Sequence, residues 1–182
     1  MRTLLAILVA ATATGFALPP PKMDRDPLGA LRERASDVLP TGGGERRRTV
    51  VPFGGWTLVC DQDVASAKRR CNLSQQIVDA RGRPAFSWTL VGERNRDPVL
   101  LLRGAGDGPR SVHIAIGRLA SVSAALDICG PAACIGVLPV GHALATALTT
   151  DRRAEITAMT NGRLSTMVAP LAGIAEALAS LR

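Results

Sequence analysis

Phe86-Ser87-Trp88-Thr89-Leu90-Val91 is the stretch that decides the fold class of this 182-residue chain. Successive side chains of a β-strand point to opposite faces, so the large apolar residues Phe86, Trp88 and Leu90 would share one face. The stretch at residues 56–60, Trp-Thr-Leu-Val-Cys, alternates in the same way. We therefore predict a half-buried strand at each place, with Trp56 and Trp88 serving as core residues rather than ligand-stacking ones.

Similar short runs recur along the chain from Val50 onward and are separated by turn residues. The unbroken apolar run at residues 99–102 is typical of a strand buried on both faces. Asn161-Gly162 predicts a two-residue hairpin turn of type I′, because both residues tolerate positive φ. Many short strands at this spacing predict a mainly-β fold, an antiparallel β-sandwich. The other expected strands cover residues 73–77, 112–116, 122–128, 135–138, 156–159 and 164–168.

Helical patterns are confined to short segments. Residues 142–148 form a candidate helix, and residues 28–38 a weaker one. Pro170 suits the first turn of a helix. An apolar stripe with helical spacing follows it, formed by Leu171, Ile174, Leu178 and Leu181. We predict a short C-terminal helix whose apolar side packs against the sandwich.

Residues 1–17 have the features of a secretory signal peptide. Arg2 provides a positive start, residues 4–17 are almost uncharged and apolar, and Pro19-Pro20-Pro21 follows. The apolar stretch is shorter than the roughly 20 residues that span a bilayer. We expect cleavage rather than an uncleaved anchor, no transmembrane segment in the mature chain, and a location in the periplasm or outside the cell.

Residues 18–49 are rich in Pro, Gly and charged side chains and include the run Arg46-Arg47-Arg48. Such a segment buries too little apolar surface to offset its ordering entropy, so we predict a disordered basic arm followed by a folded domain over residues 50–182. The whole chain carries a net charge of +7. The arm would therefore be suited to contact with an anionic surface, although a soluble basic protein needs no such partner.

Four cysteines occur as two close pairs, Cys60 with Cys71 and Cys129 with Cys134. An even number of cysteines in an exported chain indicates disulfides. Three pairings are open. We predict the local one. Cys60 ends one expected strand and Cys71 begins the next, so a hairpin would bring them together, and only a tight turn separates Cys129 from Cys134.

Four segments together resemble the invasion-associated locus B family. Phe53-Gly54-Gly55-Trp56-Thr57-Leu58-Val59-Cys60 is similar to its opening motif, and Cys71-Asn72-Leu73-Ser74-Gln75-Gln76 to its second element. The cysteines at 129 and 134 resemble its second pair, and residues 171–178 its closing helix. Gly55 stands where the family has an acidic residue, Ile174 where it has Phe, and residues 118–123 match poorly.

The resemblance implies an immunoglobulin-like or jelly-roll β-sandwich in the cell envelope of a Gram-negative bacterium. The family's name comes from a locus linked to host-cell entry, and the resemblance brings no catalytic residues with it. The basic arm at residues 18–49 lies outside the resemblance.

No catalytic, cofactor or metal motif stands out in the sequence. The chain lacks a G-x-S-x-G elbow and an H-E-x-x-H zinc motif, and His113 and His142 are its only histidines. Asp61 and Asp63 form a weak calcium pattern. Cys129 and Cys134 are separated by four residues rather than the two of a thioredoxin-type site, which favours a structural bond. Aromatic residues make up only 3% of the chain, which argues against a nucleic-acid partner.

We therefore expect a non-enzymatic, disulfide-stabilised envelope protein that acts by binding an envelope or host-surface protein. The alternative is an accessory or scaffolding subunit of a periplasmic or membrane complex. A hydrolase or redox enzyme with an unrecognised site is a third hypothesis. No cofactor and no metal are expected.

Overall fold

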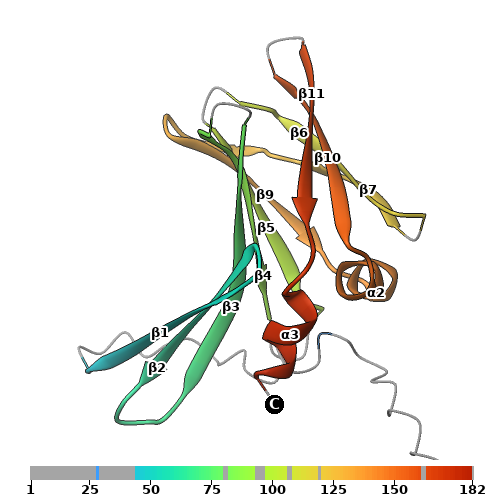
Figure 1. Cartoon of the computed structure of the whole chain (residues 1–182). Coiled ribbons are helices and arrows are strands. Elements are labelled where there is room, and N and C mark those ends of the chain that lie inside the picture. Colours follow the sequence, from blue (N-terminus) through green and yellow to red (C-terminus); the bar gives the residue numbers. More distant parts are fainter. Residues whose placement is uncertain are drawn as a thin grey trace, which may run out of the picture.

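The computed structural model describes residues 28, 44–79, 82–92, 97–105, 108–118, 120–160 and 163–181. Their strands form two antiparallel sheets (Figure 1). The seven-stranded sheet has the order β1-β2-β3-β4-β5-β9-β8, and the four-stranded sheet the order β11-β10-β6-β7. The predicted mainly-β, two-sheet fold with a short C-terminal helix is confirmed.

The seven-stranded sheet begins as a run of hairpins, because its first five strands pair with their sequence neighbours. The chain then crosses to the other sheet and returns for the last two strands. Its members are β1 (Arg46–Phe53), β2 (Trp56–Asp63), β3 (Arg69–Val78), β4 (Pro84–Val91), β5 (Val99–Ala105), β8 (Ile128–Cys129) and β9 (Ala133–Pro139).

The four-stranded sheet consists of two hairpins joined through β6 and β10. It comprises β6 (Ser111–Ile116), β7 (Ala120–Ala125), β10 (Arg153–Thr160) and β11 (Arg163–Pro170). Thr160 pairs with Arg163, while the predicted turn residues Asn161 and Gly162 lie outside the described residues. Helices α2 (His142–Thr150) and α3 (Ile174–Ala179) lie next to each other at one end of the molecule (Figure 1).

One hydrophobic core lies between the sheets and includes both helices. Trp56 and Trp88 are buried within it and stack with ring centroids 5.4 Å apart, as alternation predicted for both side chains. The apolar stripe predicted for the C-terminal helix is also buried: Leu171, Ile174, Leu178 and Leu181. Burial of these faces provides the main stabilisation of the fold.

The expected start of the folded domain at residue 50 is wrong. Strand β1 begins at Arg46, so the arginine run belongs to the sheet rather than to a disordered arm. Pairing with β2 supplies the hydrogen bonds that a polar run lacks by itself. Leu28 is part of the hydrophobic core. Residues 18–27 and 29–43 of the expected arm, and the expected signal peptide at residues 1–17, lie outside the described residues.

Two further expectations need correction. Pro170 ends β11 instead of opening the helix, which begins at Ile174 after a turn. Residues 99–102 are not buried on both faces, because Leu100 and Leu102 point into the core while Leu101 is 38% exposed on the opposite face. That face lacks a covering layer among the residues that the structure describes.

Candidate functional site

Both disulfides join adjacent strands. Cys60 is bonded to Cys71 across β2 and β3, and Cys129 to Cys134 across β8 and β9, with Cα–Cα distances of 4.1 and 4.0 Å. This is the local pairing among the three that the sequence allowed. The first bond is buried, whereas Cys129 is exposed. Neither bond lies at a helix N-terminus, the usual place for a redox-active cysteine, so the geometry is that of structural cross-links.

A buried polar contact links the two sheets beside the tryptophan pair. Gln75 is 4% exposed, and its Nε2 donates to the carbonyl oxygen of Pro170 at 2.9 Å. The same oxygen accepts a bond from Trp56 Nε1 at 3.0 Å, and Gln75 Oε1 accepts one from Trp88 Nε1 at 2.8 Å. All polar atoms of this group are therefore satisfied, which makes it a structural clamp rather than a free site.

His113 lies on the exposed face of β6, as alternation predicted. Its Nδ1 lies 3.1 Å from Ser123 Oγ, and its Nε2 lies 3.2 Å from Ser121 Oγ. Both hydroxyls come from the neighbouring strand β7. Among the described contacts no carboxylate bonds to this ring, so they do not complete a catalytic triad. His142 is the exposed first residue of α2 and lies on a different part of the fold.

Candidate metal ligands do not converge. Asp61 is hydrogen-bonded to an arginine. Asp63 accepts two bonds from Ser66, whose main-chain N–H and hydroxyl lower the pKa of that carboxyl. Within the ranges that the structure describes, no three His, Cys, Asp or Glu side chains are grouped for a metal ion. The weak calcium pattern at these two aspartates therefore gains no support.

Two surface depressions have mixed polar and apolar linings. One of about 260 Å³ lies over the outer face of β4 and β5, next to Gln76, Ser87 and Arg103. Another of about 720 Å³ adjoins Asp151, whose Oδ2 atom is buried without a hydrogen-bond partner, and Glu155. Thr150 also lines the second depression, but its hydroxyl donates to the carbonyl oxygen of Thr146 and not to a carboxylate.

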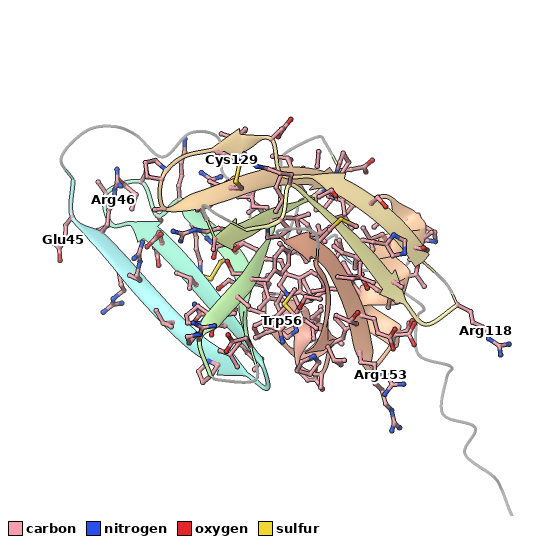
Figure 2. All side chains as sticks on the ribbon, turned by 90° about the horizontal axis from the view of Figure 1, so that it is seen from above. Glu45, Arg46, Trp56, Arg118, Cys129 and Arg153 are labelled. Atoms are coloured by element: carbon pink, nitrogen blue, oxygen red, sulfur yellow. A yellow bond between two sulfur atoms is a disulfide. The ribbon has the colours of Figure 1, made fainter. Side chains whose placement is uncertain are left out.

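The most distinctive surface is the far end of strands β1, β2 and β3, which projects away from the four-stranded sheet (Figure 1). We call it the cationic end. It carries six basic side chains and three acidic ones: Arg46, Arg47, Arg48, Lys68, Arg69 and Arg70, with Glu45, Asp61 and Asp63. Figure 2 shows Glu45 and Arg46 at the opposite end of the molecule from Arg118 and Arg153.

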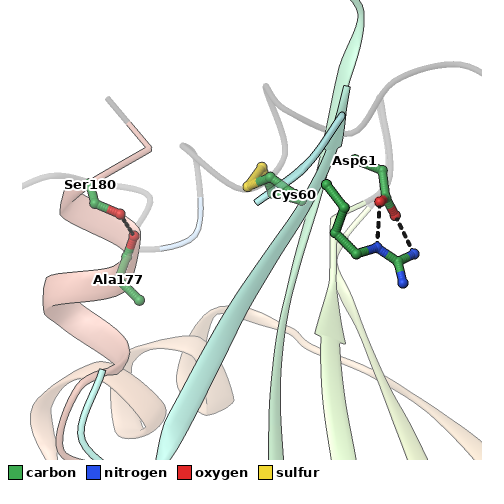
Figure 3. Close-up of a disulfide and its surroundings, with 6 residues drawn as sticks. Cys60, Asp61, Ala177 and Ser180 are labelled. Atoms are coloured by element: carbon green, nitrogen blue, oxygen red, sulfur yellow. Dashed lines mark hydrogen bonds and ion pairs between the residues drawn. A yellow bond between two sulfur atoms is a disulfide. The ribbon is translucent and has the colours of Figure 1, made fainter. Parts of the chain in front are cut away.

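One ion pair orders the middle of this end. Arg48 Nε and Nη2 donate to the two carboxylate oxygens of Asp61 at 2.7 and 3.0 Å, next to the Cys60–Cys71 bond (Figure 3). The hydrogen bond from Arg48 holds the pKa of Asp61 below its usual range. This fork geometry fixes the arginine's direction on the sheet surface.

The sequence of this chain matches the family model described as "Invasion associated locus B (IalB) protein" over residues 56–182. The chain belongs to the invasion-associated locus B family. The match covers β2 to α3, including all four cysteines and the clamp residue Gln75. It begins after β1, so the arginine run precedes the part of the chain that the family model matches.

The fold is also similar to a crystal structure of invasion associated protein B from Bartonella henselae. The TM-score is 0.61 at 16% sequence identity, and the match covers 73% of this chain and 95% of that one. At this identity the likeness concerns the fold alone. No curated protein matches the sequence of this chain. Among the described residues, no helix is long and apolar enough to cross a bilayer.

Sequence reasoning missed the clamp and the ion pair. A signal for the clamp was present, because Gln75 alternates with Leu73 and Ile77 and therefore had to face the core. A buried glutamine on a strand needs partners, which predicts hydrogen bonds from neighbouring elements.

Proposed function

We propose that this protein is exported and works in the periplasm or outside the cell, where it binds a partner instead of catalysing a reaction. Residues 1–17 would direct export, and the two disulfides suit an oxidising compartment. Membership of a family named for invasion is compatible with a host-facing partner, and an envelope protein fits equally well.

The observation that carries this proposal is the cationic end. A surplus of basic side chains on a projecting part of a sheet raises the local concentration of anionic partners and speeds their association. Arg47, Arg48 and Arg70 are all exposed there. The bound partner would accordingly be anionic at the contact.

Binding fits the remaining chemistry better than catalysis does. The imidazole of His113 is engaged by two serine hydroxyls, and the cysteines are consumed in cross-links between strands. No cofactor or metal is required for such a role.

Fractionation of the producing cell, followed by mild crosslinking and pull-down, tests the proposal. We expect the protein in the periplasmic or extracellular fraction with a bound envelope or host-surface partner. Replacing Arg47 and Lys68 together by Gln should weaken capture of this partner. The matched control replaces Arg118 and Arg153 by Gln, at the opposite end of the molecule (Figure 2). A cytoplasmic location, or equal capture by both variants, would contradict the proposal.

An accessory subunit of a periplasmic or membrane complex is the second candidate. It is favoured by an apolar strip on the outer face of β5, β8 and β9, formed by Leu101, Ile128, Ile135 and Val137, which are 37–63% exposed. The register places Ile128 opposite Ile135 and Leu101 opposite Val137, so the strip is continuous. Replacing Ile135 and Val137 by Thr would release a stoichiometric complex held through this strip and leave a partner at the cationic end in place.

A further inference from the structure

Strand β1 is a terminal strand, and among the described residues its second edge is open. It lies at the end of the seven-stranded sheet, and no strand in the described part of the chain pairs with that edge. Seven of its eight residues are exposed, on both faces of the sheet. An unprotected edge of this length can pair with a strand of another chain.

The main-chain groups that face this edge can be assigned from the register. In an antiparallel pair, hydrogen-bonded residue pairs alternate with pairs whose N–H and C=O point away. In the β1–β2 hairpin, the Val64 N–H donates to the Glu45 carbonyl, whereas the Asp63 N–H donates toward the other side, to Lys68. Even-numbered residues of β2 therefore bond to β1, and odd-numbered ones to β3.

It follows that Arg47, Thr49 and Val51, which lie opposite Gln62, Cys60 and Leu58, point their main-chain groups inward.

The residues between them point outward. Arg48 and Val50 lie opposite Asp61 and Val59, so their N–H and C=O groups are directed to this edge. Pro52 is the next outward position and has no N–H to donate. The edge therefore offers two successive donor–acceptor positions and ends at the proline.

The charge of this strand decides which occupant fits. A second copy of the chain would bring two Arg46–Arg48 runs side by side, and like charges opposite each other destabilise a strand pair. An extended segment with acidic side chains would instead place carboxylates beside Arg47 and Arg48. Its main chain would bond to the two outward positions.

We propose that the open edge of β1 accepts an extended acidic segment of a partner protein as an additional antiparallel or parallel strand. This inference rests on the proposed binding function and specifies its contact. The main-chain bonds provide affinity, and the arginines select acidic sequences against basic ones. The valine at position 50, a residue that is 56% exposed, adds an apolar contact on one face.

The test uses the full mature protein and a seven-residue peptide of alternating glutamate and valine. Deuterium exchange of the β1 amides has a built-in control. Without peptide, the amides of Arg48 and Val50 should exchange faster than those of Thr49 and Val51. Addition of the peptide should slow the two outward amides and leave the inward ones unchanged. Unchanged exchange at the outward amides would overturn the proposal.

A variant pair isolates the main-chain contribution. Val50→Pro removes an outward N–H without removing a β1–β2 hydrogen bond, while Val50→Thr keeps the N–H. Loss of one main-chain bond should weaken peptide binding by about fivefold or more in the proline variant. The threonine variant should bind within about twofold of the parent. Equal affinity of the two variants would refute strand addition, and deuterium exchange on the parent protein decides the matter if the proline variant does not fold.

Two further probes separate alternative partners. The same peptide with lysine in place of glutamate should not bind. Vesicles containing an anionic lipid test for a membrane surface instead: binding of vesicles without binding of the acidic peptide would overturn the proposal in favour of lipid. If a partner is captured from cells equally by the Val50→Pro and Val50→Thr variants, the edge inference fails while the binding function stands.

Discussion

The buried clamp around Gln75 yields the sharpest prediction for stability. We predict that Gln75→Leu, which keeps the approximate side-chain volume, destabilises the fold by about 2 kcal/mol. The substitution removes the acceptor for Trp88 Nε1 and the donor to the Pro170 carbonyl.

The magnitude follows from what each former partner retains. The Pro170 oxygen keeps its bond from Trp56 Nε1, so its loss is partial. Trp88 is fully buried, and its N–H would be left without an acceptor, which costs about 1–3 kcal/mol. The apolar leucine recovers part of this through its own burial. Gln76→Leu is the matched control, because that neighbour is exposed and its substitution should fall within about 0.5 kcal/mol of zero.

Equilibrium unfolding in urea, followed by the fluorescence of the two buried tryptophans with both disulfides intact, provides the measurement. A loss of about 2 kcal/mol corresponds to a midpoint shift of about 1 M urea. In a Trp88→Phe background the donor is absent, so Gln75→Leu should cost about 1 kcal/mol less there. A loss below about 0.5 kcal/mol in the parent protein, or no coupling between the two positions, would refute the reasoning.

Three further predictions concern other parts of the sheet. The double variant Cys60→Ala with Cys71→Ala should lose about 3 kcal/mol in urea unfolding, since the bond closes a loop with a sequence separation of 11; a loss under about 1 kcal/mol would contradict a structural role. Asp61→Asn should reduce the loss of stability in acid. The lowered pKa of Asp61 contributes stability that is present above pH 3.8, the ordinary pKa of the group, and is lost as the pH falls further. The urea midpoints at pH 7 and pH 2 should therefore differ less in the variant than in the parent. Gly173→Ala should destabilise the fold by about 2 kcal/mol or more, because φ is 103° and a Cβ would overlap with the carbonyl oxygen of Phe53. Gly130→Ala, where the added Cβ meets open space, should leave the melting temperature unchanged. Equal melting temperatures of the two variants would contradict the close approach.

Much of the fold could be predicted because its signals are local. Alternation at residues 86–91 and 56–60 depends only on neighbouring residues, and it placed both tryptophans in the core. The same holds for the short helix at residues 142–148, which extends to Thr150 in the structure.

Features that depend on contacts distant in sequence were missed. The arginine run at residues 46–48 reads as a solvated tail, and only its pairing with β2 makes it a strand. Pro170 reads as a helix start, yet its carbonyl accepts bonds from Trp56 and Gln75, more than 90 residues away in sequence, at the end of a strand.

The ion pair at the cationic end was within reach of sequence reasoning. Gly54-Gly55 is a two-residue turn that places Phe53 opposite Trp56. Moving five residues away from this pair along each strand places Arg48 opposite Asp61. The outward direction of alternate β1 amides follows from the same count. What the sequence lacked was a reason to extend the strand through three consecutive arginines.

The central claim is that this protein binds an acidic segment along the open edge of β1, and in-cell photo-crosslinking tests it most directly. A photo-crosslinking amino acid would replace Val50 and, in a separate control, Leu164, which is 69% exposed on the other sheet. The account predicts an adduct from position 50 that maps to an acidic segment of an envelope or host-surface protein, and no such adduct from position 164. Adducts only to lipid, or the same adducts from both positions, would contradict it.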